Sequence, residues 1–205
     1  MGLSHDGKYN LRRMRPTRLE AFSDGVIAIL ITIMVLELKT PEGHDWTALR
    51  SLGAKFCAYT LSFILIGIYW NNHHHMIHMT DRVNGTILWM NLHLLFWLSL
   101  IPFGTAWVGD TKLAPVPTAA YGAILLCAGI AYYILEITII RSQGPHSRLR
   151  SAVGSDAKGI ASVVMYAAAI AIAFVNPWIA EAIYLGVALM WLVPDPRIER
   201  RMRHE

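Results

Sequence analysis

The chain has 205 residues, of which 55% are hydrophobic and only 16% are Asp, Glu, Lys or Arg. Soluble domains usually carry about 25% charged residues, so this composition excludes an ordinary soluble protein. The apolar residues form blocks of about 20, the length of a helix that crosses a bilayer. The net charge of +4 reflects a bias in the loops and does not indicate a nucleic-acid-binding surface.

The first 17 residues give no sign of a signal peptide. They are polar and basic, and no small-residue cleavage site follows a short apolar region. We therefore expect the first apolar segment to remain in the mature protein. The two cysteines, Cys57 and Cys127, lie inside apolar blocks, so we expect buried thiols and no disulfide framework.

Six apolar segments are predicted to cross the membrane as helices, because a helix satisfies its own backbone hydrogen bonds in lipid. They cover residues 18–38, 48–70, 85–108, 118–141, 158–175 and 177–194. The last two are short and meet at Asn176-Pro177, which predicts a tight hairpin. We expect one six-helix domain over 1–205, with an N-terminal segment 1–17 and a tail 195–205. A unit of this size suits a subunit of a symmetric assembly.

The loop charges predict the orientation of these helices. Six spans place both termini on one side, and 14 of the 18 Lys and Arg residues fall there. The other side holds only Lys39, Arg50, Lys55 and Lys112. Short loops on the cytoplasmic side are enriched in Lys and Arg, so we expect both termini to be cytoplasmic in a multi-pass protein of the plasma membrane.

The first apolar segment begins with a helix-start signal and then keeps an acid. Thr17 and Glu20 fit the T-x-x-E capping box, so the helix should begin near Thr17. Asp24 then lies about two turns inside the helix. A carboxylate at that depth needs a hydrogen-bonding partner or water, although solvation at the headgroup level also accounts for it.

The same segment predicts a helix with two different faces. Ile29, Thr32, Ile33 and Leu36 have the spacing i, i+3, i+4 and i+7, which places them on one face. Asp24 is about 140° away from that row on a 3.6-residue helix. Ordinary packing against lipid or a protein core also explains an apolar row with one hydroxyl.

The motif R-x-x-x-F-S-D at Arg18–Asp24 resembles the signature of the endolysosomal potassium channel family and its bacterial and archaeal homologues. The resemblance continues in "YWNNHHH" at 69–75. It extends to "LWMNLHLLFWLSLIPF" at 88–103, which is similar to the W-x-N and P-F elements of the family. These elements cover about the first half of the chain, in the order of the family; the remainder matches in hydropathy alone.

The resemblance implies an all-α membrane protein that assembles as a homotetramer, with the first helix of each subunit lining a central pore. It implies a potassium-permeable cation channel whose narrowest point is Ile29. The sequence has no TVGYG-type carbonyl filter, so we expect only a moderate preference for K⁺ over Na⁺. Ile33 and Leu36 are implied as further pore-lining positions and Thr32 as the hydroxyl for selectivity. Four apolar side chains could close such a pore by excluding water. Other monovalent cations or protons are possible permeants, and a proton-coupled or proton-conducting transporter is the alternative function.

The signature residues are expected to hold the first helix to the second and third helices through a polar network. Its expected members are Arg18, Phe22, Ser23, Asp24, Trp70, His73, His74, Trp89 and Asn91. No cofactor is expected apart from permeant K⁺.

The histidines at 73–75 and 78 are the residues most similar to a metal site. His74 and His78 share a helix face at a spacing that zinc ligands use, yet no acid or cysteine nearby completes a cage. We therefore expect no metal, although histidine also titrates near neutral pH. A metal-dependent intramembrane enzyme is the third hypothesis, but the chain has neither G-x-S-x-G nor H-E-x-x-H. Glu136 lies deep in the fourth apolar segment and is expected to be an interhelical acid paired near Arg141. Glu181 lies in the sixth segment and is expected to be an interfacial residue.

Overall fold

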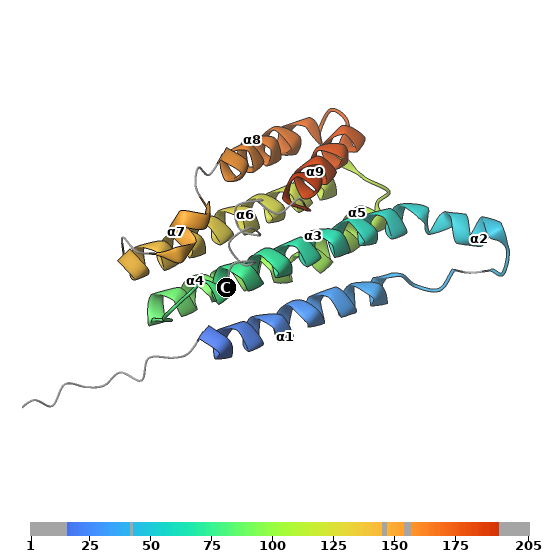
Figure 1. The fold of residues 1–205 in the computed structure, drawn as a ribbon. Coiled ribbons are helices and arrows are strands. Elements are labelled where there is room, and N and C mark those ends of the chain that lie inside the picture. The colour runs from blue at the N-terminus through green and yellow to red at the C-terminus, as the bar shows by residue number, and fades with distance from the viewer. Residues whose placement is uncertain (1–15, 42, 145–146, 154–156, 193–205) are drawn as a thin grey trace, which may run out of the picture.

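The computed structural model describes residues 16–41, 43–144, 147–153 and 157–192. The described residues form α-helices and one 3₁₀ turn (Figure 1). The α-helices are α1 (Pro16–Met34), α2 (Trp46–Ser51), α3 (Gly53–His78), α4 (Gly85–Ser99), α5 (Ile101–Asp110), α6 (Pro115–Gln143), α7 (Arg148–Val153), α8 (Ala157–Ile172) and α9 (Pro177–Leu192), and the 3₁₀ turn η1 covers Val35–Glu37.

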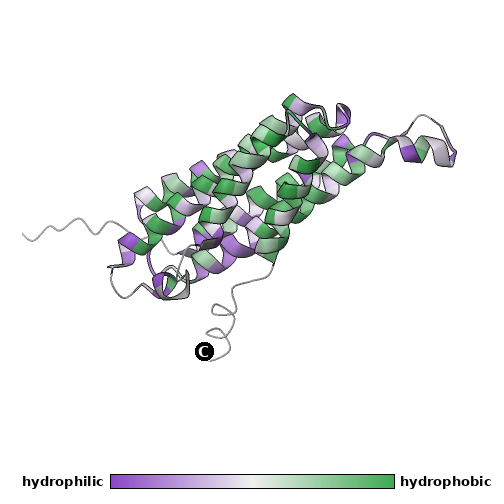
Figure 2. Ribbon diagram, turned by 90° about the horizontal axis from the view of Figure 1, so that it is seen from above, coloured by the Kyte–Doolittle hydropathy of each residue, from purple (hydrophilic) through white to green (hydrophobic). Residues whose placement is uncertain are grey.

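Within the described residues, four stretches of helix are long and apolar enough to cross a membrane: Pro16–Glu37, Gly53–His78, Gly85–Asp110 and Pro115–Gln143. Lys158–Ile172 and Pro177–Leu192 are shorter apolar helices. Hydrophobic residues run along the helices of the bundle and hydrophilic residues are concentrated toward the ends (Figure 2). The molecule is therefore an all-helical, multi-pass membrane protein; its first and last residues lie outside the described part.

The second and third predicted spans differ from the helices in the structure. Span 48–70 is predicted to be one helix, but the helix is interrupted at Leu52, between α2 and α3, and α3 continues to His78. Asp45 starts α2 early, because its carboxylate accepts a hydrogen bond from the backbone N–H of Ala48 at 2.8 Å. Span 85–108 is divided at Leu100 into α4 and α5, where Pro102 has no backbone N–H to continue the helix.

The last two helices form the predicted hairpin. The amide oxygen of Asn176 accepts a hydrogen bond from the backbone N–H of Trp178 at 3.0 Å, and Pro177 is the first residue of α9. This arrangement starts α9 immediately after the turn, because proline is well suited to the first helical position. The hairpin packs against α6.

Helix α1 lies on one side of the bundle and the α8–α9 hairpin on the other, with α3, α4 and α6 between them (Figure 1). α1 packs against α3, α4 and α5. The core contains Ile27 and Leu30 from α1, Leu94 and Leu98 from α4, and the α6 face around Leu125. α1 therefore contacts the rest of the subunit with one face and leaves the other face open.

The contact between α6 and α9 depends on a glycine, which provides a test of this packing. A Cβ atom at Gly122 would lie 2.6 Å from Cζ of Tyr184. Tyr184 is fully buried and donates a hydrogen bond to the carbonyl of Thr118 at 3.2 Å, so the ring has no free space to move into. We expect Gly122→Ala to destabilise the protein by about 1–3 kcal/mol through overpacking.

The measurement is the thermal unfolding midpoint of the purified protein in detergent. The control is Gly186→Ala, where the added Cβ would meet only the end of Met165 at 3.8 Å. Alanine normally favours a helix over glycine by about 1 kcal/mol, so the control should keep or raise the midpoint. Equal midpoints for the two variants would contradict the packing of α6 on α9.

Candidate pore face and the polar network behind it

Helix α1 has a buried face and an exposed face. The buried face consists of Leu19, Ser23, Ile27, Leu30 and Met34, which recur every three to four residues and point into the subunit. The opposite face is apolar and exposed along most of its length. An exposed apolar face of this extent needs lipid or other protein subunits as its surroundings.

The residues predicted to line a pore all lie on the exposed side. Ile29 is 59% exposed, Ile33 is 40% exposed and Thr32 is also exposed. Leu36 is 73% exposed, but it belongs to the 3₁₀ turn η1 and not to α1. A 3₁₀ turn has three residues per turn, so the direction of Leu36 differs slightly from that of an ideal α-helical row, while its side chain stays on the exposed side.

The hydroxyl of Thr32 is oriented by its own helix. It donates to the carbonyl of Ala28 at 3.0 Å and to that of Ile29 at 2.9 Å. The hydroxyl has one hydrogen and two acceptor lone pairs, so this geometry uses the hydrogen within the helix. The oxygen of Thr32 is therefore available as an acceptor on the same exposed face as Ile29 and Ile33.

A chain of buried hydrogen bonds lies behind α1 and joins it to α3 and α4. The amide nitrogen of Asn91 donates to the hydroxyl of Ser23 at 2.9 Å, and Ser23 donates to the carbonyl of Leu19 at 2.9 Å. The amide oxygen of Asn91 lies 2.7 Å from Nε2 of His73. Since that oxygen is only an acceptor, Nε2 of His73 carries the hydrogen. Ser23, His73 and Asn91 are all fully buried.

Two further contacts join α1 to α3 on either side of this chain. The indole N–H of Trp70 donates to the carboxylate of Asp24 at 2.9 Å. Nδ1 of His74 lies 2.8 Å from the carboxylate of Glu20. Glu20 and Asp24 are one turn apart on α1, and Trp70 and His74 are one turn apart on α3, so the two contacts form successive steps between the helices.

Glu20 was expected only to cap its own helix, and sequence reasoning missed its contact with His74. The spacing i, i+4 in both partners was the signal that could have found it. Asp24 has a protein partner, which agrees with the expectation that an acid at this depth needs one.

Three expected members of the network are not joined to it in the structure. Arg18, Phe22 and Trp89 are exposed, with Phe22 at 53% and Trp89 at 70%. No hydrogen bond or ion pair within the described part of the chain connects them to Ser23, Asp24 or Asn91. The side chains of Phe22 and Trp89 are positioned outward from the subunit, where they cannot reach the buried amide of Asn91.

The remaining candidate residues do not form a second site of the expected kind. Within the described ranges, no group of three or more His, Cys, Asp or Glu side chains is arranged to hold a metal ion. Cys57 and Cys127 are free thiols, but Cys57 is exposed near the start of α3, so the expectation of burial was wrong for it.

The two acids of the later helices differ in their surroundings. Glu136 is buried in α6. Glu181 is partly buried, and its Oε1 atom lacks a hydrogen-bond partner among the described residues.

The network predicts that Asn91 stabilises the subunit. Asn91→Ala removes the two amide contacts and leaves the buried groups of Ser23 and His73 without that partner. We expect a loss of about 2–4 kcal/mol, because an unsatisfied buried polar group costs more than one hydrogen bond contributes. The thermal unfolding midpoint in detergent measures this loss.

The matched control for that variant is Asn72→Ala. Its amide nitrogen donates only to the carbonyl of Ile68, within the same helix, at 3.0 Å. Tyr132 donates to the backbone carbonyl of Asn72, which the substitution retains. We expect a much smaller decrease of the unfolding midpoint in the control. A similar decrease in both variants would show that the Asn91 network stabilises the subunit no more than a hydrogen bond within one helix does.

The comparisons with known proteins agree with the sequence resemblance. Residues 18–102 match the family described as the endosomal/lysosomal potassium channel TMEM175. A potassium channel of Chryseobacterium sp. (strain P1-3) is 53% identical over 190 residues, which cover 93% of this chain and 99% of the relative. The endosomal/lysosomal proton channel TMEM175 of Danio rerio is 24% identical over 54% of this chain and 21% of its own length.

One solved structure has the same fold over most of its length. It is the crystal structure of a lysosomal potassium-selective channel TMEM175 homologue from Chamaesiphon minutus, with a TM-score of 0.74 and 27% sequence identity. The match covers 86% of this chain and 96% of the solved chain. The signature at Arg18–Asp24 lies inside the matched family region. On this evidence the chain belongs to the TMEM175 family of ion channels.

Proposed function

We propose that this protein is a subunit of a potassium-permeable cation channel in which the exposed face of α1 lines the pore. The observation that carries the proposal is the placement of Ile29, Thr32 and Ile33 on the open face of a helix whose other face is bonded to α3 and α4. The names of the relatives and of the structural neighbour support potassium as the permeant ion. The family relationship argues against an enzyme.

The pore proposal requires several copies of the chain, because one helix face cannot enclose a path. We propose a homotetramer in the plasma membrane with both termini cytoplasmic, on the grounds of the family resemblance and the loop charges. The exposed Phe22 and Trp89 are then suited to contacts with neighbouring copies, since aromatic side chains are frequent anchors of protein interfaces.

The proposed constriction is a ring of Ile29 side chains. A narrow apolar ring excludes water and thereby excludes hydrated ions, and a small dilation admits both. Ile33 and Leu36 extend the apolar wall from the ring toward η1. Thr32 lies within the same stretch, and its acceptor oxygen offers a ligand to a cation that has lost part of its water shell.

A polar substitution at Ile29, the residue of the proposed ring, tests the pore directly. We expect Ile29→Asn to enlarge the potassium current of the channel in planar bilayers, because the amide side chains keep the constriction wet. If the barrier falls by about 1.4 kcal/mol, the current rises about tenfold. The measurement is the current and reversal potential under a potassium gradient opposed by sodium.

The control is Ile179→Asn in α9, where an isoleucine of similar exposure (51%) lies in the hairpin on the other side of the bundle. Its current should equal that of the wild type. Silence of both the wild type and Ile29→Asn would reject the pore. Flux that requires a proton gradient would instead favour the proton-coupled or proton-conducting alternative, and the name of the Danio rerio relative, a proton channel, supports proton conduction as the second candidate.

The role of Thr32 is tested by two substitutions that separate its hydroxyl from its shape. Thr32→Val keeps the branched side chain and removes the oxygen, whereas Thr32→Ser keeps the oxygen. We expect the reversal potential of Thr32→Val to move away from the potassium equilibrium potential, at about 59 mV for each tenfold loss of selectivity. Thr32→Ser should remain near the wild type. Equal values for the two variants would show that the hydroxyl has no part in selectivity.

A further inference from the structure

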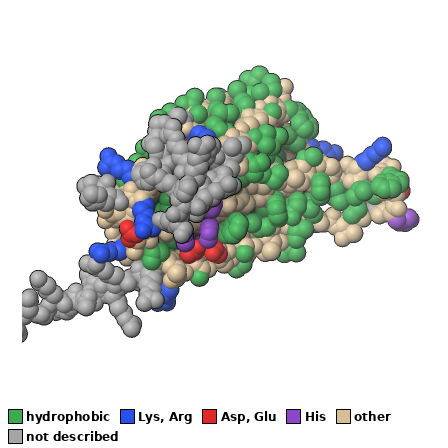
Figure 3. All heavy atoms as spheres, viewed as in Figure 1, with side chains coloured by type: hydrophobic (Ala, Val, Ile, Leu, Met, Phe, Trp, Pro, Cys, Tyr) green, Lys and Arg blue, Asp and Glu red, His purple; other side chains and the backbone are tan. Residues whose placement is uncertain are grey.

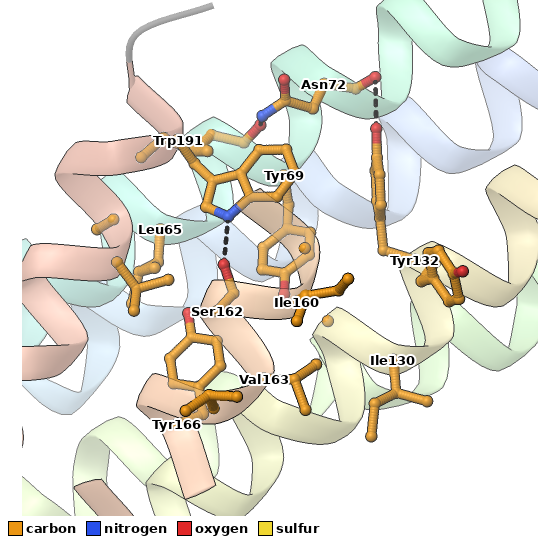
Figure 4. A pocket seen from close by; sticks show the side chains of 17 residues that line it. Leu65, Tyr69, Asn72, Ile130, Tyr132, Ile160, Ser162, Val163, Tyr166 and Trp191 are labelled. Carbon is orange, nitrogen blue, oxygen red and sulfur yellow. Dashed lines mark hydrogen bonds between the residues drawn. The ribbon is translucent and has the colours of Figure 1, made fainter. Parts of the chain in front are cut away.

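A cavity of about 260 Å³ lies between α3, α6, α8 and α9, on the other side of α3 from the polar network (Figure 4). Its floor is formed by buried side chains, namely Leu65, Tyr166, Val187 and Ala188. Its rim includes exposed apolar side chains of α6 and α8, namely Ile130, Ile160, Val163 and Val164. The cavity therefore continues into an exposed apolar surface at the level of the membrane.

The polar groups on the cavity wall are mostly occupied by the protein. The indole N–H of Trp191 donates to the hydroxyl of Ser162 at 2.8 Å, and the hydroxyl of Tyr132 donates to the backbone carbonyl of Asn72 at 3.2 Å (Figure 4). The wall therefore offers a ligand mainly hydrocarbon and aromatic surface. Pockets of this composition bind apolar groups, because transfer of a polar group into them would leave it without partners.

One end of the cavity is close to a strongly basic part of the protein. The lining includes Gly159, and the preceding residue, Lys158, lies at the start of α8. By sequence, residues 141–158 carry four basic side chains, Arg141, Arg148, Arg150 and Lys158, and one acidic side chain, Asp156. Lysine and arginine side chains are visible at this end of the molecule in Figure 3. An apolar cavity beside a basic helix end is complementary to an acyl chain with an anionic head.

The shape of the cavity also agrees with a chain. Along α8 it runs from Gly159 to Tyr166, which is roughly 10 Å at 1.5 Å per residue, toward the middle of the helix. This length accommodates part of an acyl chain whose head remains at the basic end. The helices that form the cavity lie on the opposite side of the bundle from α1 (Figure 1). If α1 lines the pore, as proposed above, the opening of the cavity faces the lipid.

We propose that this cavity is a binding site for an acyl chain of an anionic lipid from the leaflet on the α7 side. The chain lies between α6 and α8 and its head contacts the basic residues around Lys158. Such a site is separate from the ion path, and its occupancy is measurable without any current. Failure of the pore proposal and failure of the lipid proposal are therefore distinguishable.

The test uses the full-length protein in nanodiscs that contain a trace of phospholipid with a photoactivatable diazirine in the middle of one acyl chain. After illumination, labelled peptides are mapped by mass spectrometry, with phosphatidylglycerol and phosphatidylcholine compared in parallel. We expect the label to concentrate on the lining residues of α6 and α8, and to exceed the label on exposed Leu185 and Leu189 of α9 several-fold. Phosphatidylglycerol should label the cavity more strongly than phosphatidylcholine.

Gly129→Leu provides the variant that fills the cavity. Gly129 lines it, and an added Cβ would meet only the hydroxyl of Tyr69 at 3.8 Å, so the larger side chain enters free space. We expect this variant to lose about nine tenths of the cavity label, as for a tenfold loss of affinity. Gly186→Leu adds the same side chain at a residue that does not line the cavity. A Cβ atom there would meet only the end of Met165, at 3.8 Å, so this variant should keep the label.

Three results would overturn the proposal without depending on the stability of a variant. Uniform labelling of all exposed helices of the wild type would show that the cavity holds no chain. Equal labelling by the two lipids would reject the anionic head. Cavity labelling that appears only after removal of residues 193–205 would assign the cavity to the C-terminal segment, which follows Leu192 next to the lining residue Trp191.

Discussion

The rest of the structure depends on how α1 is held by hydrogen bonds from one side. In a membrane, apolar side chains gain little by exchanging lipid for protein, so burial of Ile27 or Leu30 does not by itself decide which way the helix faces. The bonds from Asn91 to Ser23 and from Trp70 to Asp24 do decide it, because breaking them would leave polar groups in a water-poor environment. They fix the rotation of α1 about its axis, and that rotation places Ile29 outward.

The position of these bonds along the helix has a consequence for the proposed gate. The polar contacts of α1 with α3 and α4 involve Glu20, Ser23 and Asp24, whereas Ile29 lies five residues later, about 7.5 Å along the axis. The helix then changes to a 3₁₀ turn after Met34. The proposed constriction thus lies between a firmly bonded segment and a change in helix type, so that a small rotation at the bonded turn would move the whole row of Ile29, Thr32 and Ile33.

Sequence reasoning predicted the features that follow from periodicity and composition. The 3.6-residue period placed Ile29, Thr32 and Ile33 on one face, and long apolar runs located the helices. It did not predict the interruptions at Leu52 and Leu100, because a hydropathy block does not register a local break in the backbone hydrogen bonds; the third span is nevertheless one stretch, Gly85–Asp110, that is long enough to cross the membrane. It also placed Trp89 and Phe22 in the network, since composition shows which side chains can bond but not which way they point. Sequence periodicity also does not predict the contacts between subunits, because these depend on how the exposed surfaces of several chains fit together.

The proposed lipid site and the pore helix are linked through α3. Tyr69 lines the cavity, and the next residue, Trp70, donates its indole N–H to Asp24 on α1. Successive residues of a helix point in directions about 100° apart, so one turn of α3 contacts the cavity on one side and α1 on the other. A chain that enters the cavity packs against Tyr69 and restricts this turn. Because interiors are close-packed and transmit small displacements, the proposed lipid would act on the same turn of α3 that bonds to Asp24 of α1, the helix that carries the proposed Ile29 ring.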